Sequence, residues 1–100
     1  MKTITVCGSC KYKKEITESA EKLALKGYCV LTPIELTKTG ENAYTEAQLS
    51  LLGEMHKEKI RLSDGIFVVN VGGYIGESTK NEIEYAKRLN KEITYYTEQV

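Results

Sequence analysis

Short runs of β-branched and apolar residues alternate along the chain with longer segments in which apolar residues recur every three or four positions. The runs lie at 3–7, 28–31, 66–70 and 93–96, and the longer segments at 11–26, 79–90 and between Thr45 and the Asp64-Gly65 turn. The runs are typical of strands and the longer segments of amphipathic helices. The order strand, helix, strand, helix, strand, helix, strand predicts a small α/β sandwich, with a parallel sheet of about four strands and helices on both faces.

Residues that typically begin or end helices and strands support these boundaries. Gly27 stands just past the last turn of the first helix, and Pro33 ends the second strand because proline cannot continue a central ladder. Thr45 is a suitable N-cap for the second helix. The segment 66–70, which is uninterruptedly apolar up to Val69, predicts a central strand that is covered on both faces.

Three loops are candidates for a binding site, because ligands of open parallel sheets bind beyond the carboxyl ends of the strands. They follow Cys7, Leu31 and Asn70. In the first loop, Gly8 and Ser9 stand between a strand and a helix, where small residues let backbone amides approach an anionic or polyhydroxyl ligand. A tight turn that needs a glycine is the alternative interpretation.

The loop 71–78 contains three glycines within five residues. Such a stretch is costly in entropy unless the backbone must take a positive φ or lie against a ligand. It matches neither the Walker A pattern nor the dinucleotide-binding pattern, so no cofactor is expected, although a phosphate or a sugar could bind at the helix start. A flexible crossover turn is the alternative. The candidate ligand-binding residues here are Gly73, Tyr74, Gly76, Ser78 and Thr79.

Two ionisable residues are candidates for catalysis. Glu82 follows Thr79 by three residues, which indicates a capping box, but a carboxylate in the first helical turn at the mouth of the sheet could also act as a nucleophile or general base on a bound sugar. His56, the only histidine, falls on the apolar face of the second helix. It is either a packed core residue or an acid or base that assists Glu82.

The three cysteines have no disulfide-framework spacing, so reduced thiols are expected. Cys7 and Cys10 form a Cys-x-x-Cys pattern, which leaves a thioredoxin-type redox pair as a further interpretation. Cys29 is expected to be a small buried hydrophobe. No second histidine and no cluster of cysteines and carboxylates has metal-ligand spacing along the chain, so no metal is expected.

Composition narrows the function classes. One hundred residues suit a single domain, 1–100, and 14 basic residues cancel 14 acidic ones, so neither nucleic acid nor an anionic membrane is expected as a partner. No membrane span or secretory signal is apparent, and a cytoplasmic location is expected. Tyr12, Tyr44 and Tyr74 lie in or near the candidate loops, where a ring could stack on a base or sugar.

Four segments together resemble the nucleoside 2-deoxyribosyltransferase-like proteins, which include deoxynucleoside-monophosphate glycosidases. These segments are 4–9, 63–70, 76–86 and 91–95. The resemblance implies a flavodoxin-like, Rossmann-like fold, a nucleoside or nucleotide ligand and a homo-oligomer. It also implies that Glu82, which opens a Glu-hydrophobic-x-Tyr-Ala pattern, is a nucleophile that forms a covalent glycosyl intermediate.

The chain also departs from that family. Gly76 occupies the position of an aspartate six residues before the nucleophile, and His56 aligns with another substrate-contacting aspartate. Asp64 matches an aspartate of the family but is interpreted as a structural turn residue. The expected function is chemistry at the N-glycosidic bond of a nucleoside or nucleoside monophosphate, and the alternative is a non-catalytic nucleotide-binding or sensing domain.

Overall fold

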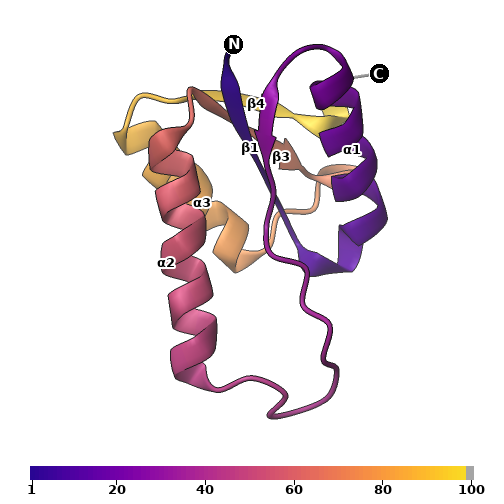
Figure 1. Ribbon diagram of the computed structural model, residues 1–100, viewed down its shortest axis with the longest axis vertical. Helices are drawn as coiled ribbons and strands as arrows, with labels where there is room; N and C mark the ends of the chain where they lie inside the picture. Colours follow the sequence, from indigo (N-terminus) through magenta and orange to yellow (C-terminus); the bar gives the residue numbers. More distant parts are fainter. Residues whose placement is uncertain (99–100) are drawn as a thin grey trace.

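A single sheet of four parallel strands, in the order β2-β1-β3-β4, forms the centre of the molecule (Figure 1). The computed structural model describes residues 1–98. Residues opposite one another in register include Val6 with Phe67 and Phe67 with Thr94. The strands are β1 (Thr3–Gly8), β2 (Cys29–Leu31), β3 (Gly65–Val69) and β4 (Glu92–Tyr95).

Three helices cover the sheet, one on one face and two on the other (Figure 1). They are α1 (Lys13–Leu25), α2 (Glu46–Leu62) and α3 (Glu77–Arg88), with short 3-10 turns at Cys10–Tyr12, Val71–Gly73 and Tyr96–Glu98. The predicted small flavodoxin-like or Rossmann-like α/β sandwich is therefore confirmed. The chain moves from β1 to one edge and then to the other, so the strand order switches between β1 and β3, where such folds bind ligands.

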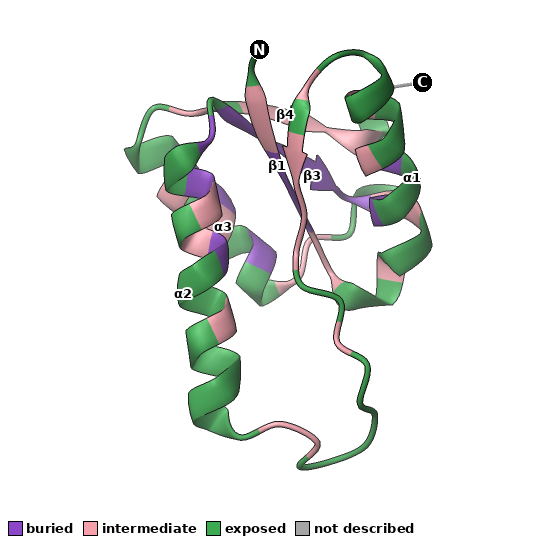
Figure 2. Cartoon of the chain, in the orientation of Figure 1, coloured by how far each residue is buried: buried purple, intermediate pink, exposed green. Residues whose placement is uncertain are grey.

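The two faces of the sheet form two separate cores, because successive side chains of a strand point in opposite directions. Buried residues are concentrated in the central strands and on the sides of the helices that face them (Figure 2). Val6 of β1 points toward α1, whereas Cys7 points toward α2 and α3. The core beneath α1 contains Val6, Ile16, Phe67 and Val69. The core beneath α2 and α3 contains Cys7, Ile60, Ile66, Val68, Ile83 and Ala86.

The helix starts agree only in part with the sequence predictions. Thr45 caps α2 as predicted, and its hydroxyl and the side chain of Gln48 form a complete capping box. The third helix begins earlier than predicted, with Gly76 as its N-cap, so Thr79 lies inside α3 and is 3% exposed. The predicted capping box between Thr79 and Glu82 is therefore wrong.

Cys29 is exposed, so its predicted burial is also wrong. It begins β2, which pairs with β1 alone and forms an edge of the sheet. An edge strand of three residues has no second neighbour to cover its first side chain.

A long connection, residues 32–45, leads from β2 to α2 and extends beyond the sheet together with the first turns of α2 (Figure 1). Two lysines attach it to the body of the protein. The Nζ of Lys59 donates to the carbonyl of Thr32 at 2.7 Å, and the Nζ of Lys13 donates to the carbonyl of Leu36 at 3.4 Å. Among the described residues, none of the helices has the length and apolar character needed to cross a membrane.

Candidate active site

Three ionisable side chains from three different elements meet between the sheet and the helices α2 and α3. The Sγ of Cys7 lies 3.4 Å from the Nε2 of His56, and that nitrogen lies 3.8 Å from Oε1 of Glu82. One donor atom from each of the three residues lies within 4.8 Å of the others. We call these three residues the Cys-His-Glu cluster.

Packing of neighbouring residues fixes the cluster. Cys7 lies near the carboxyl end of β1 and is fully buried, since its side chain alternates toward α2 and α3. His56 lies one turn before Ile60, which is fully buried, and Glu82 precedes Ile83, which is 6% exposed. The apolar faces of both helices therefore direct the two polar side chains toward β1.

Burial strongly changes the ionisation of Glu82, whose side chain is 19% exposed. Desolvation raises the pKa of this carboxyl to about 7, although a hydrogen bond from Cys7 and the positive charge of Lys57 act in the opposite direction. A carboxyl with such a pKa exchanges a proton near neutral pH, which is typical of functional carboxyls.

Burial also favours the neutral form of His56, which is 7% exposed. Desolvation, with the positive charge of Lys59 as a smaller cause, lowers the pKa of the imidazole to about 4. His56 is therefore neutral at neutral pH, and its 3.8 Å contact with Glu82 is too long for a hydrogen bond. Within residues 1–98, its Nδ1 is a buried nitrogen with no hydrogen-bond partner.

The properties of Cys7 argue against the redox interpretation. Desolvation raises the pKa of its thiol well above the ordinary value, and the negative charge of Glu82 adds to the effect. Reactive redox cysteines are partly exposed and have a lowered pKa, whereas Cys7 is fully buried and Cys10 is exposed.

A groove between α2 and α3 gives Glu82 access to solvent. Its volume is about 540 Å³, and Lys57, Ser78, Asn81 and Arg88 line it together with Glu82. His56 and Cys7 are not among the residues that line the groove. The exposed carboxylates of Glu54 and Glu84 also line the groove, so it presents the partly buried carboxyl of Glu82 among acidic, cationic and hydrogen-bonding side chains.

The glycines of the candidate loops have structural roles. Gly72 and Gly73 have φ values of 63° and 84°, in the left-handed region that favours glycine. A Cβ atom on Gly8 would lie 3.1 Å from the Cβ of Val69, so the close packing of β1 favours a glycine there. These observations support the turn interpretation of the loops without any ligand.

The loops after β1 and β3 meet through aromatic side chains. The rings of Tyr12 and Tyr74 form an edge-to-face pair with centroids 6.0 Å apart, and the Nζ of Lys11 lies 4.0 Å from the centroid of Tyr74. Tyr44 instead lies in the connection before α2, where its hydroxyl accepts a hydrogen bond from the backbone of Lys38 at 2.9 Å. Tyr12 and Tyr74 therefore face each other, and Tyr44 belongs to another part of the surface.

The structure divides the expected ligand-binding residues among several places. Ser78 lies in the groove with Glu82, whereas Gly8 lines a second pocket of about 430 Å³ between α1 and the connection 32–45. Ser9 accepts a hydrogen bond from the backbone of Lys11, and Thr79 is buried in α3. Their roles in binding stay predictions.

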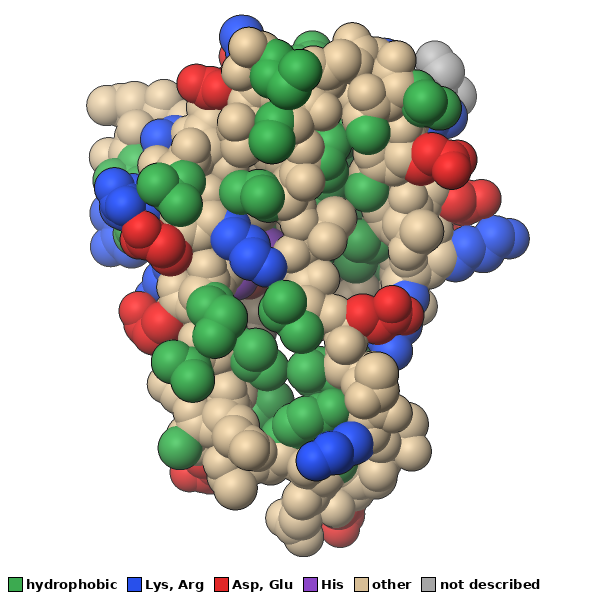
Figure 3. Space-filling view, viewed as in Figure 1, with side chains coloured by type: hydrophobic (Ala, Val, Ile, Leu, Met, Phe, Trp, Pro, Cys, Tyr) green, Lys and Arg blue, Asp and Glu red, His purple; other side chains and the backbone are tan. Residues whose placement is uncertain are grey.

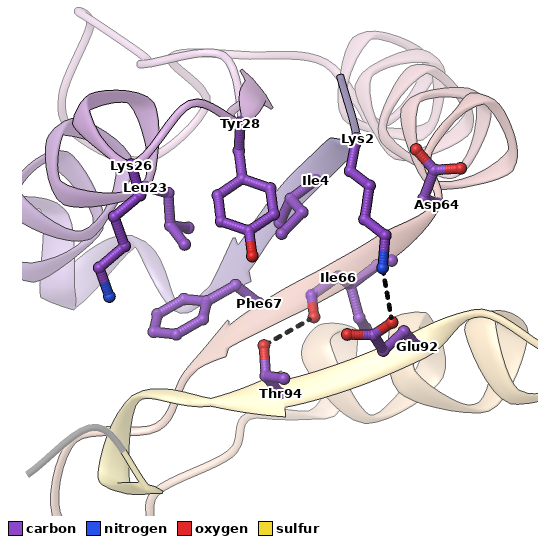
Figure 4. Close-up of a pocket in the computed structure, with 11 residues that line it drawn as sticks. Lys2, Ile4, Leu23, Lys26, Tyr28, Asp64, Ile66, Phe67, Glu92 and Thr94 are labelled. Carbon is purple, nitrogen blue, oxygen red and sulfur yellow. Dashed lines mark hydrogen bonds and ion pairs between the residues drawn. The ribbon is translucent and has the colours of Figure 1, made fainter.

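A smaller cavity, of about 110 Å³, lies at the amino ends of the strands (Figure 4). Several of its polar side chains already have partners: Lys2 pairs with Glu92 at 3.5 Å, and the Oδ2 of Asp64 accepts a hydrogen bond from the backbone of Thr3 at 2.8 Å. The interpretation of Asp64 as a structural residue is supported. Because ligands bind at the opposite ends of parallel strands, this cavity is not our candidate site.

The resemblance to the deoxyribosyltransferase-like proteins rests on the segments that form β1, β3, α3 and β4. No protein-family model matches the sequence, and no curated protein matches it. The role of Glu82 as a nucleophile stays a prediction, now with a defined environment. Sequence reasoning missed the third member of the cluster, Cys7. The alternation of residues 3–7 could have indicated it, because that pattern determines the face of the sheet on which the Cys7 side chain lies.

Proposed function

We propose that the protein binds a nucleoside or nucleoside monophosphate and acts at its N-glycosidic bond, with Glu82 as the nucleophile. The observation that carries this proposal is the position of Glu82. Its carboxyl is largely buried beside the carboxyl end of β1, yet it lines an open groove between α2 and α3.

The reaction has two steps. An oxygen of Glu82 forms a bond to the anomeric carbon while the carbon–nitrogen bond breaks, and its electron pair leaves with the base, which takes a proton from solvent. A water molecule or an acceptor base then attacks the same carbon. This attack breaks the bond to Glu82, restores the carboxylate and releases a proton from the attacking group.

The surroundings of Glu82 suit this role. Attack requires the carboxylate form, which accumulates as the pH rises through the pKa of about 7, and the charge of Lys57 favours that form. His56 was expected as an acid or base, but it lies behind Glu82 and does not line the groove. We therefore assign His56 to positioning Glu82.

The groove also offers groups for the rest of the ligand. Ser78 and Asn81 provide neutral hydrogen-bonding groups suited to sugar hydroxyls. Lys57 and Arg88 are the two cationic groups that a 5′-phosphate could contact, and the carboxylates of Glu54 and Glu84 line the same groove. No resident cofactor takes part in the proposed chemistry.

The experiment is an incubation of the purified protein with a panel of nucleosides and nucleoside 5′-monophosphates. Chromatography measures release or exchange of the base. The wild type is compared with Glu82→Gln and with Glu21→Gln, which changes an exposed glutamate on α1. We expect Glu21→Gln to retain activity and Glu82→Gln to lose at least about a thousandfold, as for a removed nucleophile.

Equal base release by Glu82→Gln and the wild type would disprove the role of Glu82.

The second candidate function, a non-catalytic nucleotide-binding or sensing domain, is favoured by one observation. Gly76 stands where the family's transferases carry an aspartate, and a Cβ there would lie 3.3 Å from the hydroxyl of Tyr74. That candidate would be supported if no base were released and a nucleotide raised the unfolding temperature of both the wild type and Glu82→Gln.

The proposal includes self-association and a cytoplasmic location. The first turns of α2 lie beyond the sheet and expose Leu49, Leu51 and Met55, which are 48%, 60% and 42% exposed. Hydrophobic side chains gather between this part of α2 and the preceding connection (Figure 3). Exposed apolar side chains one helical turn apart, such as Leu51 and Met55, suit an interface, and the exposed cysteines Cys10 and Cys29 suit a reducing compartment.

A further inference from the structure

We propose that Cys7, His56 and Glu82 form a binding site for a thiophilic divalent transition metal ion such as Zn²⁺ or Co²⁺. The proposal goes beyond the glycosidic chemistry, because it concerns an ion and not a nucleoside. The three residues are far apart in the sequence, which is why their spacing along the chain did not indicate a metal.

The geometry of the cluster is close to that of a tetrahedral site. Bonds from Zn²⁺ to sulfur, nitrogen and oxygen place neighbouring donor atoms roughly 3.3–3.6 Å apart. The Sγ of Cys7 and the Nε2 of His56 are already 3.4 Å apart, and Oε1 of Glu82 is 3.8 Å from that nitrogen. Since all three donors lie within 4.8 Å, a small movement of the Glu82 side chain completes the arrangement.

The burial of His56 is an independent observation that points to a ligand. Its side chain is 9% exposed, its Nε2 faces Cys7 and Glu82, and its Nδ1 has no hydrogen-bond partner among the described residues. A buried imidazole with so few polar partners is costly. A bond from Nε2 to a metal ion stabilises the buried ring through that nitrogen and places the imidazole proton on Nδ1.

The donor types select the kind of metal. A thiolate and an imidazole favour zinc-like ions, whereas Mg²⁺ and Ca²⁺ require a set of oxygen ligands. On binding, the thiol proton of Cys7, and the proton of Glu82 where present, leave to solvent. The dication then balances one thiolate and one carboxylate, so the buried cluster has no net charge.

Metal binding and nucleophilic attack use the same carboxylate, so they exclude each other. The side of Glu82 that lines the groove leaves space for a water molecule as a fourth ligand, as in zinc sites with three protein ligands. The failure of one proposal leaves the other intact, because metal binding is measured without any nucleoside.

The test is a titration of the full chain with Co²⁺ under anaerobic, reducing conditions, after treatment with a chelator and its removal. Absorption reports the thiolate-to-cobalt charge-transfer band and the visible bands of four-coordinate Co²⁺. We expect saturation at one ion per chain, and displacement by Zn²⁺. The variants are Cys7→Ser and Glu82→Gln, with Cys10→Ser and Cys29→Ser as controls that change exposed cysteines.

We expect Cys7→Ser to abolish the charge-transfer band, and Glu82→Gln to keep it but to bind at least ~10-fold more weakly. Both control variants should match the wild type. Circular dichroism verifies folding, and Glu82→Gln keeps the test valid if Cys7→Ser does not fold. The proposal is overturned if no band forms, if the band disappears in Cys10→Ser or Cys29→Ser, or if Glu82→Gln binds like the wild type.

Discussion

Burial reverses the usual order in which Glu82 and His56 ionise. In water a glutamate loses its proton at a lower pH than an imidazolium does, but here the pKa of Glu82 is about 7 and that of His56 about 4. At neutral pH the contact between them therefore involves a neutral imidazole. At neutral pH their proximity is therefore not a buried ion pair.

We predict that the wild-type free energy of unfolding changes little between pH 4.5 and 6.5, because the effects of Glu82 and His56 oppose each other. The raised pKa of Glu82 gives stability that is present below pH 4.5 and lost as the pH rises to 7. The lowered pKa of His56 gives stability that is present above pH 6.5 and lost as the pH falls to 4. Each shift corresponds to about 3 kcal/mol.

Glu82→Gln should remove the first effect and leave the second. The variant should lose about 3 kcal/mol of stability as the pH falls from 6.5 to 4, measured by urea unfolding of metal-free protein in chelator. The other ionisable groups that act on the pair are Cys7 on β1 and Lys57 and Lys59 on α2, and all three are retained. Glu21→Gln should follow the wild type, and a flat profile for Glu82→Gln would contradict the prediction.

At this scale the sequence indicated two of the three residues in the cluster. A motif indicates Glu82, and the position of His56 on an apolar helix face indicates that residue. Cys7 stands out only in a local pattern with Cys10, because its contact with His56 joins residues 49 positions apart. Such contacts depend on the packing of helices against strands, which local spacing does not contain.

The helices α2 and α3 begin in different ways. Thr45 provides α2 with a full capping box, whereas Gly76 begins α3 without a side-chain hydrogen bond. Both starts follow loops, and the sequence offered a threonine followed by a capping partner in each case. Thr79 was not used, because the helix begins two residues earlier and its inner face buries that threonine. The burial of Thr79 thus explains why α3 begins before this residue, although threonine is a favourable N-cap residue.

Thr45→Ala should reduce the free energy of unfolding by about 1 kcal/mol, the usual effect of removing an N-cap side chain. Thr39→Ala, in the exposed part of the connection before α2, is the matched control and should have little effect. Urea unfolding of both variants measures the difference. Equal losses would show that the capping box does not stabilise α2.

The molecule consists of a helix-covered sheet and of a segment that extends beyond it, formed by the connection 32–45 and the first turns of α2 (Figure 1). The alternation of strand and helix patterns was enough to predict the sheet and its layers, because each pattern records which side of an element is buried. It did not predict that the connection 32–45 and the first turns of α2 would lie beyond the sheet (Figure 2). An apolar helix face has the same pattern whether it packs on its own sheet or on another molecule.

Leu51→Lys should convert an associated wild type into monomers, since it places a charge on the exposed face of α2, where Leu51 is 60% exposed. Sedimentation equilibrium measures the mass, and circular dichroism verifies that the fold is kept. Leu25→Lys is the control, because Leu25 is 82% exposed on α1. A monomeric wild type, or dissociation by both variants, would contradict self-association through α2.

The unequal exposure of the three cysteines gives the protein an internal reporter of its own opening. An alkylating reagent should modify Cys10 and Cys29 at once, and Cys7 only when α2 or α3 separates from the face of the sheet on which Cys7 lies. Mass spectrometry over time would show two fast additions and a third whose rate measures the opening equilibrium between these helices and the sheet. Three equally fast additions would mean that the helices separate from the sheet freely, and a third addition slowed by Zn²⁺ would show that the ion holds them together.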